Sequence, residues 1–398
     1  MSHSLLELRR ITKRFGATVA LEDVNFTLRS GEVHALIGEN GAGKSTLMKI
    51  VAGVYLPDHA EMALADPNPS IAGRPRMFPY YPANPAEARD KGIAMIYQER
   101  NLAPDLSVEA NIMLGLEPVD GIGFIHKKRL RNKAKEALCT LGHKDIDPLT
   151  PVHLLGPGKR QVVEIARALV VRARVVVLDE PTSSLSPPDV TQLFETIRRL
   201  RDQGIGVIYI SHFLEEILEI ADYYTVLRDG HVVDSGSAAE ADITALIRVM
   251  TGRTLGTLFP CVPHEIGGPI LQLEGLTGGR MPEGAVLRLH KGEILGLFGL
   301  VGSGRTELLR ALYGLDPIVE GRVTVRGVSD QGQPPYVRRD QAFGLLSEDR
   351  QAEGLTLDQS VADNMTYGHV QAFSTMGYLS RSRQWERVRW WIGKLGIR

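Results

Sequence analysis

The stretch Gly38-Glu39-Asn40-Gly41-Ala42-Gly43-Lys44-Ser45 decides the fold of this chain. It fits the pattern Gly-x4-Gly-Lys-Ser/Thr of a phosphate-binding loop, and it lies between an apolar run at 33–37, which predicts a strand, and a predicted helix at 46–52. A glycine-rich turn could match by chance, but the motif requires this position between strand and helix. Glycines let backbone N–H groups point inward, and the helix N-terminus adds partial positive charge. We therefore expect Lys44 to reach the β- and γ-phosphates of a nucleotide and Ser45 to ligate Mg²⁺.

Length and composition indicate a soluble globular protein with two domains. The chain has 398 residues, of which 43% are apolar and 23% charged. The formal net charge of −1 produces no global field that would recruit nucleic acid or an anionic membrane. A basic cluster at 127–133 is interpreted as the solvated face of a helix.

The sequence contains no targeting or cysteine-based signal. No window approaches a membrane span, and the N-terminus lacks the regions of a signal peptide, so a cytoplasmic location is expected. Cys139 and Cys261 have no ligand-like spacing, which argues against a disulfide framework or a zinc site.

Strand and helix patterns alternate along the first 250 residues. Strands are predicted at 5–8, 24–28, 33–37, 92–97, 175–178 and 207–210, and helices at 46–52, 108–113, 129–141, 162–171 and 188–201. The proline-rich segment 57–85 is interpreted as an irregular surface insertion. This alternation predicts an α/β fold with a mainly parallel sheet and helices on both faces.

Polar residues follow three of the later predicted strands. Gln98, the pair Asp179-Glu180 and His212 each come directly after an apolar run. The carboxyl ends of parallel strands gather on one edge of a sheet, so these side chains are expected to converge with the phosphate loop on one nucleotide. Asp179 would hold Mg²⁺ or its water shell, and Glu180 would orient and deprotonate the water that attacks the γ-phosphate.

The chain repeats itself. Residues 292–299 mirror residues 31–38 at an offset of 261, the separation of Gly38 from Gly299, and Lys44 falls on Arg305. A duplicated strand–loop–helix module is therefore predicted. The expected domains are residues 1–255 and 270–398, joined by a linker at 256–269 that is rich in Gly and Pro.

With these motifs in this order, the first 250 residues resemble the nucleotide-binding domain of an ATP-binding cassette (ABC) transporter, a P-loop NTPase with an added helical subdomain. The resemblance implies that Phe15 stacks on adenine, that Gln98 senses Mg²⁺ and the membrane subunit, and that His212 contacts the γ-phosphate. Phe15 as a core aromatic and His212 as a helix cap remain alternatives. The ATP-binding residues implied by the motif are Phe15, Gly38, Glu39, Asn40, Gly41, Ala42, Gly43, Lys44, Ser45 and Thr46, and the implied metal ligands are Ser45, Gln98 and Asp179.

One segment departs from the family pattern. The place of the signature motif, usually Leu-Ser-Gly-Gly-Gln, is taken by Leu155, Gly156, Pro157, Gly158, Lys159, Arg160 and Gln161. In the family this segment is presented across a dimer to the other subunit's ATP. Gly156 lacks the serine hydroxyl, which should weaken the contact by about 1.5–3 kcal/mol. The D-loop departs as well, because Ser186 stands where the family has aspartate.

The tandem arrangement is similar to the fused ATP-binding subunits of bacterial monosaccharide importers that serve ribose, xylose, galactose and related sugars. The segments 101–108, 299–307 and 347–355 carry this narrower resemblance. It implies ATP hydrolysis at the cytoplasmic face of the inner membrane, with permease subunits and, through them, a periplasmic sugar-binding protein as partners, and no nucleic acid. Arg305 replaces the phosphate-loop lysine with a bulkier planar group, so the second site is not expected to turn over ATP.

The second copy is expected to be incomplete. By the offset between the copies, the counterparts of the signature segment, of the acidic pair Asp179-Glu180 and of His212 would fall beyond Arg398. The sequence is therefore interpreted as a truncated or split member of the family that needs a second ATP-binding chain or forms a homodimer, and the apolar end at 390–395 is expected to lack packing partners.

Two other functions stay open. The chain could be a binding module that holds ATP but hydrolyses it poorly, since the partner signature is absent. It could also be a soluble twin-cassette factor acting on ribosomes, but Arg305 and the Gly/Pro-rich linker disfavour that class.

Overall fold

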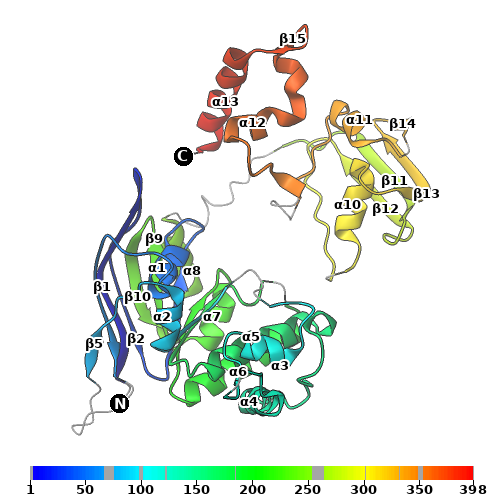
Figure 1. Ribbon diagram of the computed structural model, residues 1–398. Helices are drawn as coiled ribbons and strands as arrows, with labels where there is room; N and C mark the ends of the chain where they lie inside the picture. Colours follow the sequence, from blue (N-terminus) through cyan, green and yellow to red (C-terminus); the bar gives the residue numbers. More distant parts are fainter. Residues whose placement is uncertain are drawn as a thin grey trace. The chain divides into compact units, whose positions relative to one another are not determined.

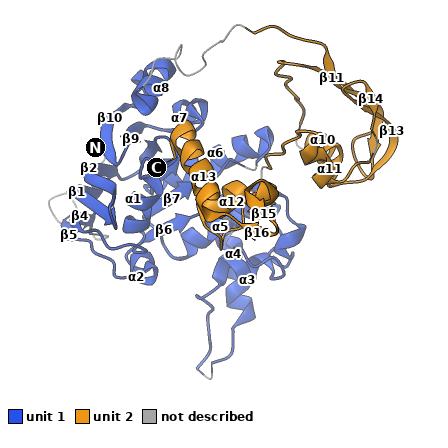
Figure 2. Cartoon of the chain, turned by 90° about the horizontal axis from the view of Figure 1, so that it is seen from above, with its two compact units in different colours: residues 1–261 blue, residues 262–398 orange. Residues whose placement is uncertain are grey.

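The computed structural model describes residues 3–66, 76–97, 102–121, 123–183, 185–252, 264–300, 302–330, 332–347 and 353–397. The chain forms two compact units, residues 1–261 and 262–398 (Figure 2). Gln98, Glu348, Cys261 and the part of the predicted linker before His264 lie outside the described residues. No described helix combines the length and the apolar character needed to cross a membrane.

A six-stranded sheet forms the centre of unit 1 (Figure 1). Its strand order is β10-β9-β3-β8-β7-β6; β3 pairs in parallel with β8 and β9, β7 pairs in parallel with β6 and β8, and only β10 is antiparallel. The mainly parallel sheet expected from the sequence is thus confirmed. The bounds are β3 Val33–Ile37, β6 Ile93–Ile96, β7 Val175–Asp179, β8 Gly206–Ile210, β9 Tyr223–Arg228 and β10 His231–Ser237.

The two faces of this sheet belong to two different cores. Along β7, Val176 and Leu178 pack into the core formed with the helices, whereas Val175 and Val177 pack into the core on the opposite face. A strand buried on both faces explains why its sequence is uniformly apolar rather than alternating. The first core contains residues of α3 Val108–Met113, α4 Lys127–Thr140, α5 Pro157–Val170, α6 Pro187–Asp202, α7 Leu214–Ile220 and α8 Ile243–Thr251.

The opposite face is covered by α1 Lys44–Val51 and by a second, antiparallel sheet of order β2-β1-β4-β5. Its strands are β1 Ser4–Phe15, β2 Thr18–Arg29, β4 His59–Ala65 and β5 Met77–Pro79, and α2 Pro85–Asp90 follows them. The interpretation of 57–85 as an irregular insertion was therefore wrong: Met62 and Leu64 of β4 are buried, and β4 pairs with β1. The prolines around β4 and within the three-residue edge strand β5 hid this sheet from the sequence pattern, although β4 itself contains no proline.

A buried asparagine holds the turn before α3 in the helical part of unit 1. The Asn111 side-chain nitrogen donates to the carbonyls of Ala103, Leu106 and Ser107 at 3.0–3.2 Å, and its oxygen accepts from the Ala103 N–H at 2.8 Å. Arg131 of α4 donates to Glu109 of α3 at 2.8 Å. The pairs α3–α4 and α4–α5 pack directly on one another.

Unit 2 repeats the antiparallel sheet of unit 1 in order. Its strands run β12-β11-β13-β14, with bounds β11 Pro269–Gly278, β12 Ala285–His290, β13 Ile318–Val325 and β14 Val328–Ser329. The helix that follows the repeated loop is present as α10 Arg305–Tyr313, and its N-cap Gly304 is left-handed, as is Gly43 before α1. Of the predicted strand–loop–helix repeat, the helix and its N-cap glycine are thus confirmed.

The strand predicted by the repeat at 292–299 does not form. Residues 293–300 have no regular secondary structure, and Ile294 and Phe298 are 94% and 96% exposed. In unit 1 the equivalent β3 pairs with parallel strands on both edges, whereas the described strands of unit 2 make only antiparallel pairs. An apolar segment without pairing neighbours has nothing to satisfy its backbone groups in a sheet.

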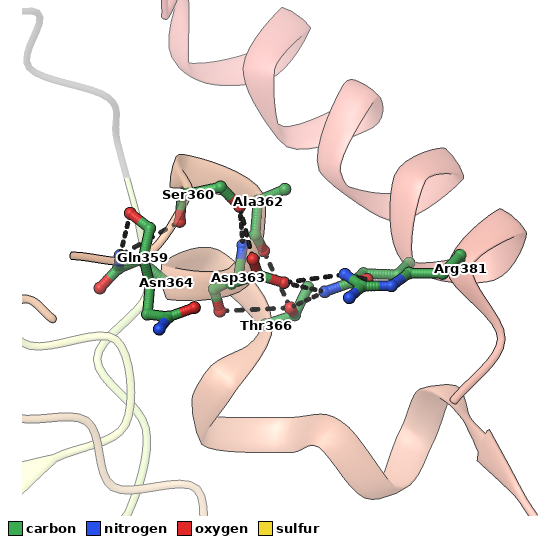
Figure 3. A network of polar contacts seen from close by, with 8 residues as sticks. Gln359, Ser360, Ala362, Asp363, Asn364, Thr366 and Arg381 are labelled. Atoms are coloured by element: carbon green, nitrogen blue, oxygen red, sulfur yellow. Dashed lines mark hydrogen bonds and ion pairs between the residues drawn. The ribbon is translucent and has the colours of Figure 1, made fainter. Parts of the chain in front are cut away.

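The helical part of unit 2 contains an asparagine network like that around Asn111, and Figure 3 shows Asn364 beside Gln359 and Ser360. Asn364, which lies 253 residues after Asn111, donates to Thr356, Gln359 and Ser360 carbonyls and accepts from the Thr356 N–H. Arg381 donates to Asp363 at 3.1 Å, as Arg131 does to Glu109. The remaining elements are α11 Pro335–Asp340, α12 Val361–Thr366, α13 Arg381–Leu395, β15 Ser374–Thr375 and β16 Tyr378–Leu379.

The duplicated asparagines provide a test of this assignment. Asn111→Ala leaves the Ala103 N–H and three carbonyls without their partner and should destabilise unit 1 by about 2–3 kcal/mol. Asn364→Ala should act on unit 2 alone. All three tryptophans of the chain lie in unit 2, so tryptophan fluorescence follows the unfolding of unit 2 alone. Circular dichroism follows the unfolding of both units. In urea, Asn364→Ala should shift the fluorescence midpoint and Asn111→Ala only the dichroism; equal shifts in both signals for both variants would contradict the assignment.

Candidate functional site

The phosphate loop leaves the end of β3, and its glycines are required by close packing. Gly43 has φ of 105°, and a Cβ there would lie 2.7 Å from the Ala20 carbonyl oxygen of β2. A Cβ at Gly38 would collide with the Leu227 carbonyl of β9. The loop is thus clamped between β2 and β9, and α1 starts at Lys44 with no side-chain cap. Uncapped N–H groups at a helix N-terminus form an anion site.

Lys44 is buried at the base of this loop. Its ammonium donates to the carbonyls of Gly38 at 2.7 Å and Glu39 at 3.1 Å. Burial lowers the pKa of Lys44, and the carboxylates of Glu180, Asp179 and Glu39 oppose that effect. A desolvated cation beside three anions is suited to a phosphate chain, which presents several charged oxygens at once.

The ends of β7 and β8 bring the acidic pair and the histidine together. The Glu180 N–H donates to the Ile210 carbonyl at 2.9 Å, and Glu180 adopts φ of 47°, which is rare for a side chain with a Cβ. His212 Nδ1 lies 3.2 Å from Glu180 Oε1. The strained backbone turns the Glu180 carboxylate toward the residue that follows the neighbouring strand.

Asp179 closes β7 with its carboxylate largely withdrawn from water. Burial raises the pKa of Asp179, Glu180 raises it further, and Lys44 and Lys49 lower it. Lys44 and Asp179 each shift the pKa of the other, so the phosphate loop and the end of β7 lie close together. A buried carboxylate whose charge is only partly balanced is a fitting ligand for a divalent cation.

The residues that could hold Mg²⁺ would supply only part of its ligands, and the phosphates of the nucleotide would supply the others. Ser45 is exposed at the start of α1, and Asp179 lies across from the same loop. Within the described ranges, no group of three or more His, Cys, Asp and Glu side chains is placed to hold a metal. Mg²⁺ is usually bound through one or two protein ligands together with substrate phosphates, which this donor set matches. Gln98, the third predicted ligand, lies outside the described residues.

Phe15 is not a core aromatic and His212 is not a helix cap, which were the two alternatives to a role in nucleotide binding. Phe15 is 43% exposed at the end of β1, in edge contact with Tyr55 and with Lys13 5.4 Å from its ring centroid, so it is not a core aromatic. The N-cap of α7 is Phe213, with no side-chain capping bond, so His212 is not a helix cap.

A half-buried glutamate of α7 was missed by the sequence reasoning. The Glu216 carboxylate accepts from Thr182 at 2.9 Å, from Tyr209 at 2.7 Å and from Ser211 at 3.0 Å. These three hydroxyls lie next to Glu180 or His212 along the chain or on the preceding strand, so Glu216 holds both strand ends in place. The sequence does not single out Glu216, because Glu215 and Glu219 lie among the same buried residues Leu214, Ile217 and Ile220.

The signature segment begins α5 rather than preceding it. The helix starts at Pro157 with Gly156 as N-cap, whereas the sequence placed its start near 162. Gly158 packs against α6, since a Cβ there would overlap the Asp189 carboxylate. Lys159 pairs with Asp145 at 2.7 Å, and Arg160 donates to the His153 carbonyl at 2.8 Å. Among the described residues, no hydrogen bond or ion pair joins this segment to the phosphate loop of the same chain.

Unit 2 presents the counterpart loop in a different state. Arg305 opens α10, where a Cβ on Gly304 would lie 3.0 Å from Met281. The described strands of unit 2 include no parallel pair, so among them no strand-end edge forms beside Arg305.

Comparison with known sequences places the chain beside one family. The model of the family described as ABC transporter matches residues 21–183 and 283–398. The ribose import ATP-binding protein RbsA 1 of Rubrobacter xylanophilus is 44% identical over 395 residues, covering 99% of this chain and 76% of that protein. The arabinose import ATP-binding protein AraG of Chromohalobacter salexigens is 38% identical over 400 residues, covering 100% and 78%.

Solved structures support the same fold. An ATP-binding cassette of an ABC transporter in its ADP conformation has a TM-score of 0.52 and 23% identity, covering 63% of this chain and 99% of that one. CbiO1 from Clostridium perfringens, part of an ABC transporter complex, has a TM-score of 0.50 and 25% identity, covering 64% and 98%. Both confirm the α/β class.

The raised pKa of Asp179 predicts a pH-dependent stability cost. A folded-state pKa above the ordinary value means that this group favours folding only at low pH, and that the benefit is lost as pH rises through the folded-state value. Asp179→Asn should therefore raise the melting temperature of the nucleotide-free protein at pH 7, with the gain vanishing below about pH 4. Thermal scans from pH 4 to 8 measure this.

The exposed Asp202, varied to Asn, is the matched control and should change nothing. With Mg²⁺ and a non-hydrolysable ATP analogue, Asp179→Asn should gain less stability than the parent. A variant that is less stable at pH 7 without ligand would contradict the assignment.

Proposed function

Because the chain belongs to the ABC transporter family, we propose that it is the ATP-binding and ATP-hydrolysing subunit that energises import of a monosaccharide through a bacterial ABC transporter. Relatives named for ribose and arabinose import match nearly the whole chain, which supports a monosaccharide as cargo. The observation that carries the ATPase activity is the Glu180–His212 pair, 3.2 Å apart at the same sheet edge as the buried Lys44.

Binding is assigned to the loop and its surroundings. The N–H groups of Gly38, Glu39, Asn40, Gly41, Ala42, Gly43 and Lys44 and the N-terminus of α1 would hold the phosphates, with Ser45 and Thr46 at its first turn. The half-exposed ring of Phe15 would stack on adenine. Mg²⁺, held by Ser45, Asp179 and Gln98, would neutralise charge between the β- and γ-phosphates.

Hydrolysis is assigned to the strand-end residues. Glu180 would orient a water molecule and accept its proton as the water oxygen bonds to phosphorus and the bond to the β-phosphate oxygen breaks, which releases ADP and phosphate. His212 would hold the γ-phosphate and, through its contact with Glu180, fix the carboxylate. Glu216 would keep both in register through Tyr209 and Ser211.

Partners follow from the family role. Permease subunits at the cytoplasmic face of the membrane would receive the conformational change, and a periplasmic sugar-binding protein would act through them. The signature segment Leu155–Gln161 would face the ATP of a second ATP-binding chain or a second copy, because no hydrogen bond or ion pair between described residues joins it to the phosphate loop of its own chain. No nucleic-acid role is proposed.

Glu180→Gln tests the catalytic assignment. The amide cannot accept a proton, so ATP turnover should fall by about a hundredfold or more while ATP affinity survives. A steady-state phosphate-release assay with and without reconstituted permease measures turnover, and calorimetry measures affinity. Glu219→Gln on the exposed side of α7 is the control. A Glu180 variant that keeps most of its activity would remove this residue from the mechanism.

Replacing Gly156 by serine restores the hydroxyl of the family's signature motif and tests its role. Its φ of −66° suits any residue, and a Cβ there would meet nothing within 4 Å. Gly156→Ser therefore adds the hydroxyl without strain and should raise permease-stimulated turnover by about tenfold, the worth of one charge-assisted hydrogen bond. Gly156→Ala supplies the methylene without the hydroxyl and should not. Equal rates for the two variants would show that the hydroxyl has no role.

A further inference from the structure

A hairpin between α3 and α4 presents apolar side chains to solvent. Val119 and Ile125 form an antiparallel bridge, and the His126 N–H donates to the Pro118 carbonyl at 2.7 Å. In Figure 2 this segment extends away from the body of unit 1. Val119 is 57%, Phe124 70% and Ile125 51% exposed. Three large apolar side chains on one short projection are more than scattered surface residues would give.

The hairpin is ordered by its own contacts rather than by burial. The Asp120 carboxylate accepts from the Phe124 N–H at 2.9 Å, and the Asp120 N–H donates to the Phe124 carbonyl at 2.9 Å. Glu117 accepts from the Gly115 N–H at 3.1 Å. The Asp120 carboxylate thus stabilises the turn, and Glu117 binds the backbone just before the hairpin. None of these hydrogen bonds is made by the side chains of Val119, Phe124 or Ile125.

Cations follow the apolar residues directly. Lys127, Lys128 and Arg129 begin α4, all exposed, and none has an ion-pair partner among the side chains that the structure describes. Lys133 and Lys135 continue the exposed basic side of α4, whereas its buried residues, Leu130, Ala134, Ala137 and Leu138, face the core. In a chain of net charge −1, this concentration of positive charge is local.

We propose that the described residues of the hairpin, 117–121 and 123–125, and the start of α4 at 127–129 form a contact site for an anionic phospholipid surface. Phe124, Ile125 and Val119 would enter the interfacial region, and Lys127, Lys128 and Arg129 would bind the phosphate headgroups. Apolar insertion and basic attraction act together in interfacial binding, and neither alone holds a protein firmly. The sequence reading of the basic cluster as a solvated face leaves the adjacent exposed aromatic unexplained, whereas a headgroup layer accommodates both. This inference is independent of ATP hydrolysis.

Vesicle sedimentation of the full chain tests the site. The chain should partition onto vesicles of phosphatidylethanolamine with about a third phosphatidylglycerol, and weakly onto neutral phosphatidylcholine. Each basic residue near such a surface is worth about fivefold in partitioning, so Lys127→Gln with Lys128→Gln should lower it about thirtyfold. Phe124→Ser with Ile125→Ser should lower it at least about tenfold. Lys144→Gln with Leu149→Ser, an exposed pair elsewhere in unit 1, is the matched control.

The outcomes separate lipid from protein contact. Retained Mg-ATP binding shows that each variant is folded. Equal partitioning onto neutral and anionic vesicles, or an equal loss in the control pair, overturns the proposal. Unchanged vesicle binding in the lysine and aromatic variants also overturns it, and if those variants instead lose affinity for a detergent-solubilised permease, the hairpin is a protein contact.

Discussion

The parallel hydrogen bonding of β3 is the constraint on which the nucleotide site depends. All five residues of β3 are buried, and the strand pairs with β8 on one edge and β9 on the other. Because its backbone groups are hydrogen-bonded on both edges, β3 ends at a defined residue, and the phosphate loop begins directly after it. The corresponding residues of unit 2, 294–298, are also mostly apolar but have no described strand beside them: no strand forms there, and Ile294 and Phe298 face solvent.

Strand pairing also sets the distances between groups far apart in sequence. The Glu180 N–H to Ile210 carbonyl bond locks the end of β7 to the end of β8, which places Glu180 beside His212. Glu216 then holds the hydroxyls around them from the helix that follows. Because β3 lies next to β8, Lys44 interacts electrostatically with the carboxylates of Glu180 and Asp179. A strained, buried and charged arrangement of this kind is costly without a ligand, as the raised pKa of Asp179 indicates.

Sequence reasoning was accurate where periodicity and motif agreed. The strand 33–37 and the helix 108–113 were predicted to the residue. Of the strand-end residues, Glu180 and His212 lie together where β7 and β8 end, whereas Gln98 lies outside the described residues. It failed where pairing decides the outcome. The strand β4 was missed because its partner β1 is far away in sequence, and β5 was missed because it pairs with β4. The strand at 292–299 was predicted because its pattern mirrors that of β3. Glu216 could not be assigned, because its role arises from three hydroxyls brought together only by the fold.

The central claim is that this chain has one functional nucleotide site, built on Lys44, and that the copied loop at Arg305 is not a second. Calorimetric titration of the full chain with Mg-ATP tests it most directly. The account predicts one site per chain, binding weakened by about a hundredfold or more in Lys44→Ala, and binding unchanged in Arg305→Ala. Two equivalent sites, or a Lys44→Ala variant that binds as well as the parent chain, would contradict it.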